Sequence, residues 1–205
     1  VIQGRAKPHV VVAALMQENG LGQMWRANAT LSLQEQILGR CKKASIHVAL
    51  IGEVNYPRCL TNDISPPAVL FYQGDLQALA TRRVGMIGTR SATASGRYMT
   101  SHLAFELAMN GVCVISGLAR GIDAWAHHGV LRAREKKSAS VMAAAPVGVV
   151  ASGLDYVYPK EHADLWRNVA QAGALVSESP PGAPAVRTGA AHCSPWPSPG
   201  PDHRW

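Results

Sequence analysis

The most constraining feature of this chain is a strand, loop and helix pattern that occurs twice in succession between Val84 and His127. Two short apolar runs, at 84–87 and 112–115, each stop at a loop rich in small residues. Short runs of this kind, without alternating polar residues, are typical of strands buried on both faces of a parallel sheet. The pattern predicts a βαβ unit with a right-handed crossover, followed by a further helix.

The segment between the two strands has the spacing of an amphipathic helix. Met99, Leu103 and Leu107 recur at helical intervals, with Ala104 and Ala108 beside them. A glycine at 111 then follows as a C-terminal cap. We therefore expect Met99, Leu103 and Leu107 to form the apolar side of this helix.

The loops that follow the two strands share one chemical character, with small residues and hydroxyls around a single arginine. They read GTRSATASG at 88–96 and SGLARG at 116–121. Such loops lie together at the carboxyl ends of parallel strands, where ligands bind. Glycine lets the backbone approach an anion, the helix N-terminus offers N–H groups, and arginine binds in a bidentate manner. The loops predict a phosphate site formed by Gly88, Thr89, Arg90, Ser91, Ser116, Gly117, Arg120 and Gly121.

The spacing of the glycines narrows the choice of phosphate ligand. In the first loop Gly88 is followed by Thr89 and Arg90, so the loop lacks the G-x-G-x-x-G of dinucleotide folds and the G-x-x-x-x-G-K-[ST] of nucleoside triphosphatases. Bound NAD and hydrolysed ATP are therefore disfavoured, and we expect no cofactor. Nucleotides, sugar phosphates and nucleic-acid backbones all remain compatible with the loops.

Charge and composition agree with a polyanionic partner. The 205 residues carry a formal net charge of +7, with a pI near 9.5. The four cysteines at 41, 59, 113 and 193 lie far apart without a C-x-x-C pair, so we expect neither a metal site nor a disulfide framework, and a reduced, cytoplasmic location. No apolar stretch approaches the roughly 18 residues of a membrane span, and no signal peptide opens the chain.

The rest of the chain predicts further elements around this unit. Expected helices lie at 10–16, 31–44, 123–134 and 162–172, and expected strands at 47–51, 68–72, 147–151 and 174–176. We interpret 68–72 as an edge strand, 134–146 as an inserted segment, and the cluster Arg40, Lys42 and Lys43 as the solvated end of a helix. His127 and His128 have no matching carboxylate or cysteine, so we interpret them as packing or surface residues.

Four segments, in this order, resemble the DprA/Smf family of DNA-processing, or DNA recombination-mediator, proteins. They are YPRCL with SPPAVLFYQGDL at 56–60 and 65–76, VGMIGTR at 84–90, SGLARGIDAWAH at 116–127 and GLDYVYP at 153–159. The resemblance implies an α/β fold with a Rossmann-like three-layer parallel sheet, preceded by a small helical segment. It also identifies Asp123, Gly153 and Asp155 as structural motif residues, with Asp123 holding the loop backbone.

The resemblance further implies a function. Proteins of this family bind single-stranded DNA, protect incoming strands in natural transformation and load the RecA recombinase onto them, and they are mediators rather than enzymes. The expected partners are single-stranded DNA and RecA, and no membrane is expected to be involved. Whether the protein forms a homodimer is left open. Arg90 and Arg120 would contact backbone phosphates, and the alternative for both is an internal ion pair that stabilises the loops.

The resemblance predicts three regions and an interruption. A helical segment occupies 1–48, a partial Rossmann-like domain 49–180, and a disordered tail rich in proline and glycine 181–205. The family continues here with an arginine-asparagine-arginine motif, further strands and a second glycine-serine loop, none of which this sequence contains. We therefore expect a frameshift or premature stop, and an incomplete sheet with an unpaired apolar strand edge.

Two other functions stay open from the sequence. The first is a related Rossmann-like phosphoribohydrolase that cleaves nucleoside monophosphates, for which Glu178 is the one carboxylate well placed after a strand. That enzyme class carries a P-G-G-x-G-T motif and a catalytic glutamate, neither of which is present. The second is an inactive, truncated product.

Overall fold

In the computed structural model of the chain, residues 31–64, 66–136 and 143–184 are described. The α-helices are α3 (Leu31–Lys43), α4 (Arg58–Thr61), α5 (Ala94–Met109), α6 (Ile122–Glu135) and α7 (Ala163–Ala172), with 3₁₀ helices η1 (Leu76–Ala80) and η2 (Lys160–His162). The strands are β1 (His47–Leu50), β2 (Val69–Gly74), β3 (Arg83–Gly85), β4 (Cys113–Ser116), β5 (Val147–Val149) and β6 (Ala174–Ser177). The expected helix at 10–16, the core of the inserted segment and most of the expected tail lie outside these ranges.

One mostly parallel sheet holds the described part of the chain together. Its strand order is β1-β2-β6-β5-β4-β3. Strands β3 to β6 are parallel, with Val84 opposite Val114, whereas β2 runs antiparallel to both β1 and β6. The predicted α/β class and the predicted βαβ unit are confirmed.

The prediction that residues 68–72 form an edge strand is wrong. Strand β2 lies inside the sheet, between β1 and β6, where Tyr72 is opposite Val176. Its successive residues Leu70 and Phe71 are both buried, on opposite faces of the sheet. A continuous apolar run is what an interior strand requires. The same pairing covers β6, so the expected unpaired edge is not found there; the outer strands are β1 and β3.

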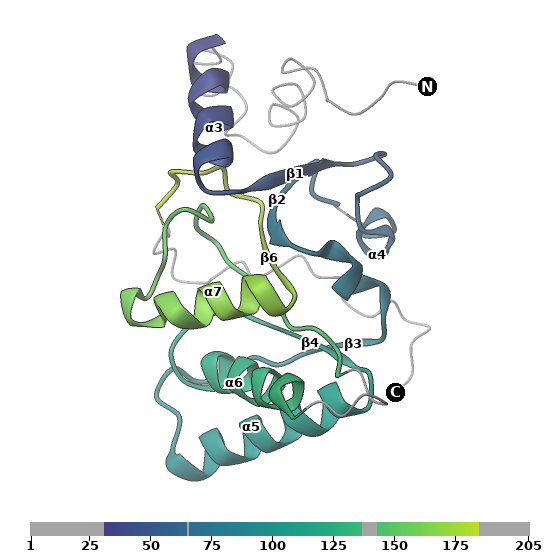
Figure 1. Cartoon of the computed structure of the whole chain (residues 1–205), viewed down its shortest axis with the longest axis vertical. Coiled ribbons are helices and arrows are strands. Elements are labelled where there is room, and N and C mark those ends of the chain that lie inside the picture. Colours follow the sequence, from purple (N-terminus) through teal and green to yellow (C-terminus); the bar gives the residue numbers. More distant parts are fainter. Residues whose placement is uncertain (1–30, 65, 137–142, 185–205) are drawn as a thin grey trace.

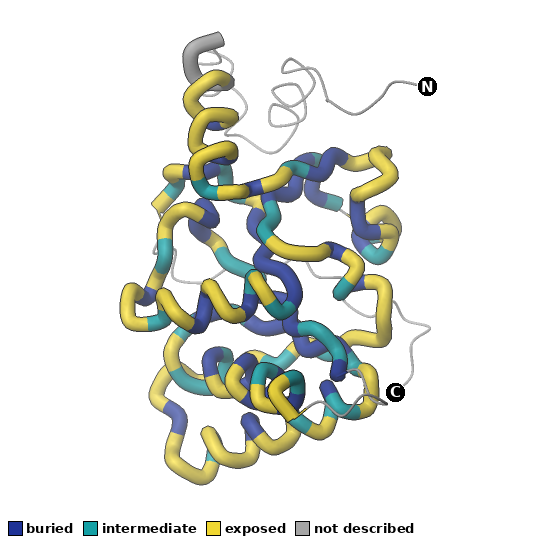
Figure 2. Tube along the Cα trace, in the orientation of Figure 1, coloured by how far each residue is buried: buried dark blue, intermediate teal, exposed yellow. Residues whose placement is uncertain are grey.

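The three crossover helices α5, α6 and α7 lie on one face of the sheet (Figure 1). They connect β3 to β4, β4 to β5 and β5 to β6, so each connection moves one strand further in the same direction. Crossovers of one hand that advance in one direction place their helices on the same face. The second face is covered by the shorter α4 and η1, through Leu60, Leu76 and Leu79. Figure 2 shows the buried residues concentrated in the middle of the molecule, between these layers.

The expected apolar side of α5 faces the core only in part. Leu107 packs against the core beside the buried Ala104 and Ala108, but Met99 and Leu103 are 63% and 53% exposed. Thr100 and Ser101 are buried in their place. Helix α6 explains this, because it approaches α5 through Gly129, where a Cβ atom would lie 2.3 Å from the Ser101 carbonyl oxygen. Two backbones this close leave room only for small side chains. The helix was predicted correctly, and its buried face only in part.

Candidate nucleic-acid interface

The two arginine loops meet at the carboxyl ends of β3 and β4. We define loop 1 as residues 86–93 and loop 2 as residues 117–121. The Ile122 N–H, at the start of α6, donates to the Thr89 carbonyl oxygen at 3.1 Å. At the base of the loops, the buried Ser116 hydroxyl donates to the Met86 carbonyl oxygen at 2.5 Å. Backbone contacts therefore hold loops 1 and 2 side by side.

Gly121 lets loop 2 approach loop 1 closely. Its φ of 81° and ψ of −133° lie in a region that is almost restricted to glycine. A Cβ atom at this position would also lie 2.1 Å from the Thr89 carbonyl oxygen and 2.7 Å from that of Arg90. Gly121 is therefore required by the geometry of the junction itself.

Asp123, in the first turn of α6, ties both loops to that helix. Its Oδ1 atom accepts the Gly88 N–H at 3.3 Å, and a Cβ atom at Gly117 would lie 2.5 Å from its Oδ2 atom. Burial raises the pKa of Asp123, while the Gly88 N–H and the positive charge of Arg90 act in the opposite direction. The Asp123 carboxylate therefore holds loops 1 and 2 in position against α6.

Some of the predicted donor groups are engaged within the loops. The Gly88 N–H is bonded to Asp123, the Ser91 N–H donates to the Thr89 hydroxyl at 3.2 Å, and the Ser116 side chain is buried. Gly88, Thr89, Arg90, Ser91 and Arg120 are exposed, whereas Gly117 and Gly121 are half-buried. The structure therefore brings the predicted residues together, and several of them make contacts that shape the loops.

Arg120 forms an exposed ion pair, which is the alternative that the sequence left open for it, with a partner that the sequence did not reveal. Its Nε and Nη2 atoms both lie 2.5 Å from Oε1 of Glu161 in η2. The hydrogen bond between the two side chains raises the pKa of Arg120 and lowers the pKa of Glu161. The two side chains are 59% and 50% exposed, and ion pairs in contact with water contribute little stability. An anionic ligand could replace Glu161 at small cost.

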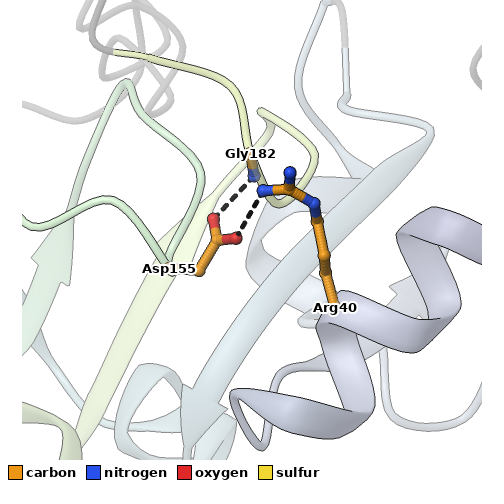
Figure 3. A network of polar contacts seen from close by, with 3 residues as sticks. All are labelled: Arg40, Asp155 and Gly182. Atoms are coloured by element: carbon orange, nitrogen blue, oxygen red, sulfur yellow. Dashed lines mark hydrogen bonds and ion pairs between the residues drawn. The ribbon is translucent and has the colours of Figure 1, made fainter.

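Gly153 and Asp155 organise a different part of the molecule (Figure 3). Asp155 accepts the Gly182 N–H at 2.6 Å through Oδ1, and its Oδ2 atom lies 3.2 Å from Nη1 of Arg40. The Gly153 N–H donates to the Ala183 carbonyl oxygen at 2.9 Å. These contacts join α3 to the segment that follows β6. The sequence interpretation of Arg40 as a solvated helix end missed this partner, which lies 115 residues away.

The two histidines of α6 have different surroundings. His127 is fully buried, with Nε2 3.3 Å from the Ser116 carbonyl oxygen, and burial lowers its pKa to about 4. His128 is exposed, and its ring centroid lies 5.5 Å from that of Trp125. Within the described ranges, no three acidic, cysteine or histidine side chains are grouped so as to hold a metal ion. None of the helices in those ranges has the length and apolar character needed to cross a membrane.

A parallel sheet with two abutting arginine loops at its carboxyl edge defines a Rossmann-like protein with a candidate phosphate-binding surface. Comparison with known families makes the class specific. The sequence model of DNA recombination-mediator protein A matches residues 47–191, and the chain belongs to this family.

Curated relatives agree with this assignment. The chain is 34% identical over 147 residues to DNA processing protein DprA of Bacillus subtilis (strain 168), which covers 71% of this chain and 46% of the relative. It is 31% identical over 180 residues to protein Smf of Escherichia coli (strain K12), which covers 85% of this chain and 46% of the relative. The chain thus spans about half the length of these relatives.

Two solved structures have a similar fold. DprA from Streptococcus pneumoniae superposes with a TM-score of 0.67 at 21% identity, covering 89% of this chain and 60% of that one. DNA processing protein A from Helicobacter pylori, whose structural study concerns its single-stranded DNA binding mode, superposes with a TM-score of 0.57 at 27% identity, covering 70% of this chain and 61% of that one. The six-stranded α/β sheet is therefore the fold of this family.

Proposed function

We propose that this chain is a cytoplasmic, single-stranded-DNA-binding recombination mediator of the DprA type, which protects incoming DNA and loads RecA in natural transformation. Membership of the family supports this role, as does the single-stranded DNA binding of the Helicobacter pylori relative. The observation that carries the proposal is the direct contact of loops 1 and 2, each of which presents one exposed arginine. The action is binding and delivery of a strand rather than bond cleavage.

The chemistry of the surface suits a phosphodiester backbone. Arg90 and Arg120 each offer a planar fork of N–H donors that matches two phosphate oxygens. Helices α5 and α6 begin at these loops, so their N-terminal dipoles add to the positive potential. Contacts of this kind read no base sequence and weaken as salt rises.

Fluorescence anisotropy with a labelled oligo-dT tests the proposal. The double variant Arg90→Ala, Arg120→Ala should bind at least about tenfold more weakly at moderate salt, and the slope of log K against log salt should fall by about 1.4, or roughly 0.7 per lost phosphate contact. Arg167→Ala is the matched control, because Arg167 is an exposed arginine of α7 that pairs with Asp164. Full affinity in the double variant would contradict the phosphate role.

A gain of affinity provides a test that misfolding cannot imitate. If phosphate displaces Glu161 from Arg120, then Glu161→Gln should bind oligo-dT about two- to fivefold more tightly, which is the range expected for an exposed ion pair. Asp164→Asn removes a comparable surface charge from α7 and should have a smaller effect. Weaker binding by Glu161→Gln would show that Glu161 positions Arg120 rather than competes with DNA.

The mediator role and the enzyme alternative need separate measurements. Stimulation of RecA filament formation on an oligonucleotide coated with single-strand binding protein tests the loading step. Release of ribose 5-phosphate from AMP would instead favour the phosphoribohydrolase.

Light scattering of the purified protein, with and without oligo-dT, determines whether it dimerises.

A further inference from the structure

Two exposed aromatic residues lie in segments that adjoin loop 2. Tyr158, in the segment between β5 and η2, is 49% exposed, and Trp125, in the first turn of α6, is 37% exposed. Both side chains are therefore accessible to a ligand that approaches the charged loop.

Tyr158 belongs to a segment that is bonded to loop 2. Three residues after Tyr158, Glu161 bonds to the guanidinium of Arg120. In the next residue, Nδ1 of His162 lies 2.8 Å from the Leu118 carbonyl oxygen. The segment that follows Tyr158 therefore lies against the loop that presents Arg120.

Trp125 follows loop 2 directly, in the first turn of α6. Its backbone N–H donates to the Gly121 carbonyl oxygen at 3.2 Å, and its ring centroid lies 5.5 Å from that of His128. Each of the two segments that adjoin loop 2 therefore contains one exposed aromatic residue.

We propose that Tyr158 and Trp125 are stacking platforms for unpaired bases of a strand whose phosphate is held by Arg120. This inference rests on the proposed function and adds a source of selectivity to it. The face of any base can stack on an aromatic ring, whereas the bases of a duplex are already stacked on one another and cannot reach these side chains. The arginines attract any nucleic acid, and the rings make the surface prefer single strands.

The test compares oligo-dT with an abasic oligonucleotide of the same length, which keeps the phosphates but lacks the bases. The wild-type protein should bind oligo-dT more tightly. Tyr158→Ala and Trp125→Ala should each lose about tenfold in affinity for oligo-dT and little for the abasic strand. Tyr158→Phe, which keeps the ring, should retain wild-type affinity, and Tyr98→Ala, which removes an exposed tyrosine of α5, should leave both affinities unchanged.

Each failure has its own signature. Equal wild-type affinity for the two oligonucleotides would overturn the stacking role while leaving the proposed function intact. Equal losses on both strands in Tyr158→Ala would show that Tyr158 acts only through Arg120, and would also overturn it. Absence of wild-type binding to either strand would contradict the proposed function itself.

Discussion

At the scale of single residues, the sequence predicted that the two arginine loops lie together, but it could not assign a role to each position in them. A glycine in a phosphate-binding loop can let the backbone approach a ligand, or it can allow an unusual backbone conformation. The sequence is the same in both cases. The structure shows that Gly121 serves the junction between the loops, because Thr89 occupies the space of a side chain. Glu161 was missed altogether, since nothing near position 161 signals a partner 41 residues earlier.

Gly121→Ala should therefore destabilise the protein strongly. The substitution combines an unfavourable backbone conformation with a clash against Thr89, and we expect a loss of more than about 3 kcal/mol in urea denaturation. Gly111→Ala is the matched control, because Gly111 also has a positive φ, of 74°, but an added Cβ would meet nothing within 4 Å. That variant should lose only about 1 kcal/mol. Equal losses would show that the contact between the loops contributes nothing.

His127 should make the stability of the protein depend on pH. Its folded-state pKa is lowered from 6.5 to about 4, so between these values the unfolded chain binds a proton that the folded chain excludes. The free energy of unfolding should fall as pH drops from about 6.5 to about 4, by about 1.4 kcal/mol per pH unit from this residue. The difference between the wild-type and His127→Gln denaturation curves across this range isolates the effect. Parallel curves would contradict it.

At the scale of elements, hydrophobic spacing located the helices and strands but not always their buried faces. It predicted the helix over α5 and chose Met99 and Leu103 for the core, because they are the largest apolar residues at helical intervals. The face that a helix buries depends on what approaches it, and here Gly129 of α6 selects small residues. Which helix packs against α5 depends on the fold, and it cannot be inferred from the spacing of residues within α5 alone.

The contact network of Asp155 should hold the segment after β6 in place. Asp155→Ala removes both the acceptor for the Gly182 N–H and the partner of Arg40, so hydrogen exchange should become faster at Gly153 and Gly182. Arg40→Ala removes only the exposed ion pair and should have a smaller effect on the same amides. Equal exchange rates in both variants would mean that the bond to Gly182 does not hold the segment.

At the scale of the whole molecule, the α/β class followed from the sequence because its strands are short, apolar and separated by helices. The strand order did not follow. An apolar run bounded by Pro67 and Gly74 is compatible with an edge or an interior strand, and the choice depends on the pairing of β2 with β6, about a hundred positions later. The motifs were enough to indicate the family, whereas the strand order depends on pairing between strands that are far apart in the sequence.

The position of β2 also constrains how the chain can be made. During synthesis β1 and β2 emerge before β6, so β2 obtains its second partner only when residues 174–177 have left the ribosome. Until then Phe71 lacks the part of its covering that α7 and β6 provide, and a two-stranded hairpin alone is marginally stable. Pairing between residues so far apart in the sequence slows folding and prolongs the exposure of apolar surface in intermediates. We therefore expect the nascent chain to benefit from chaperones during translation.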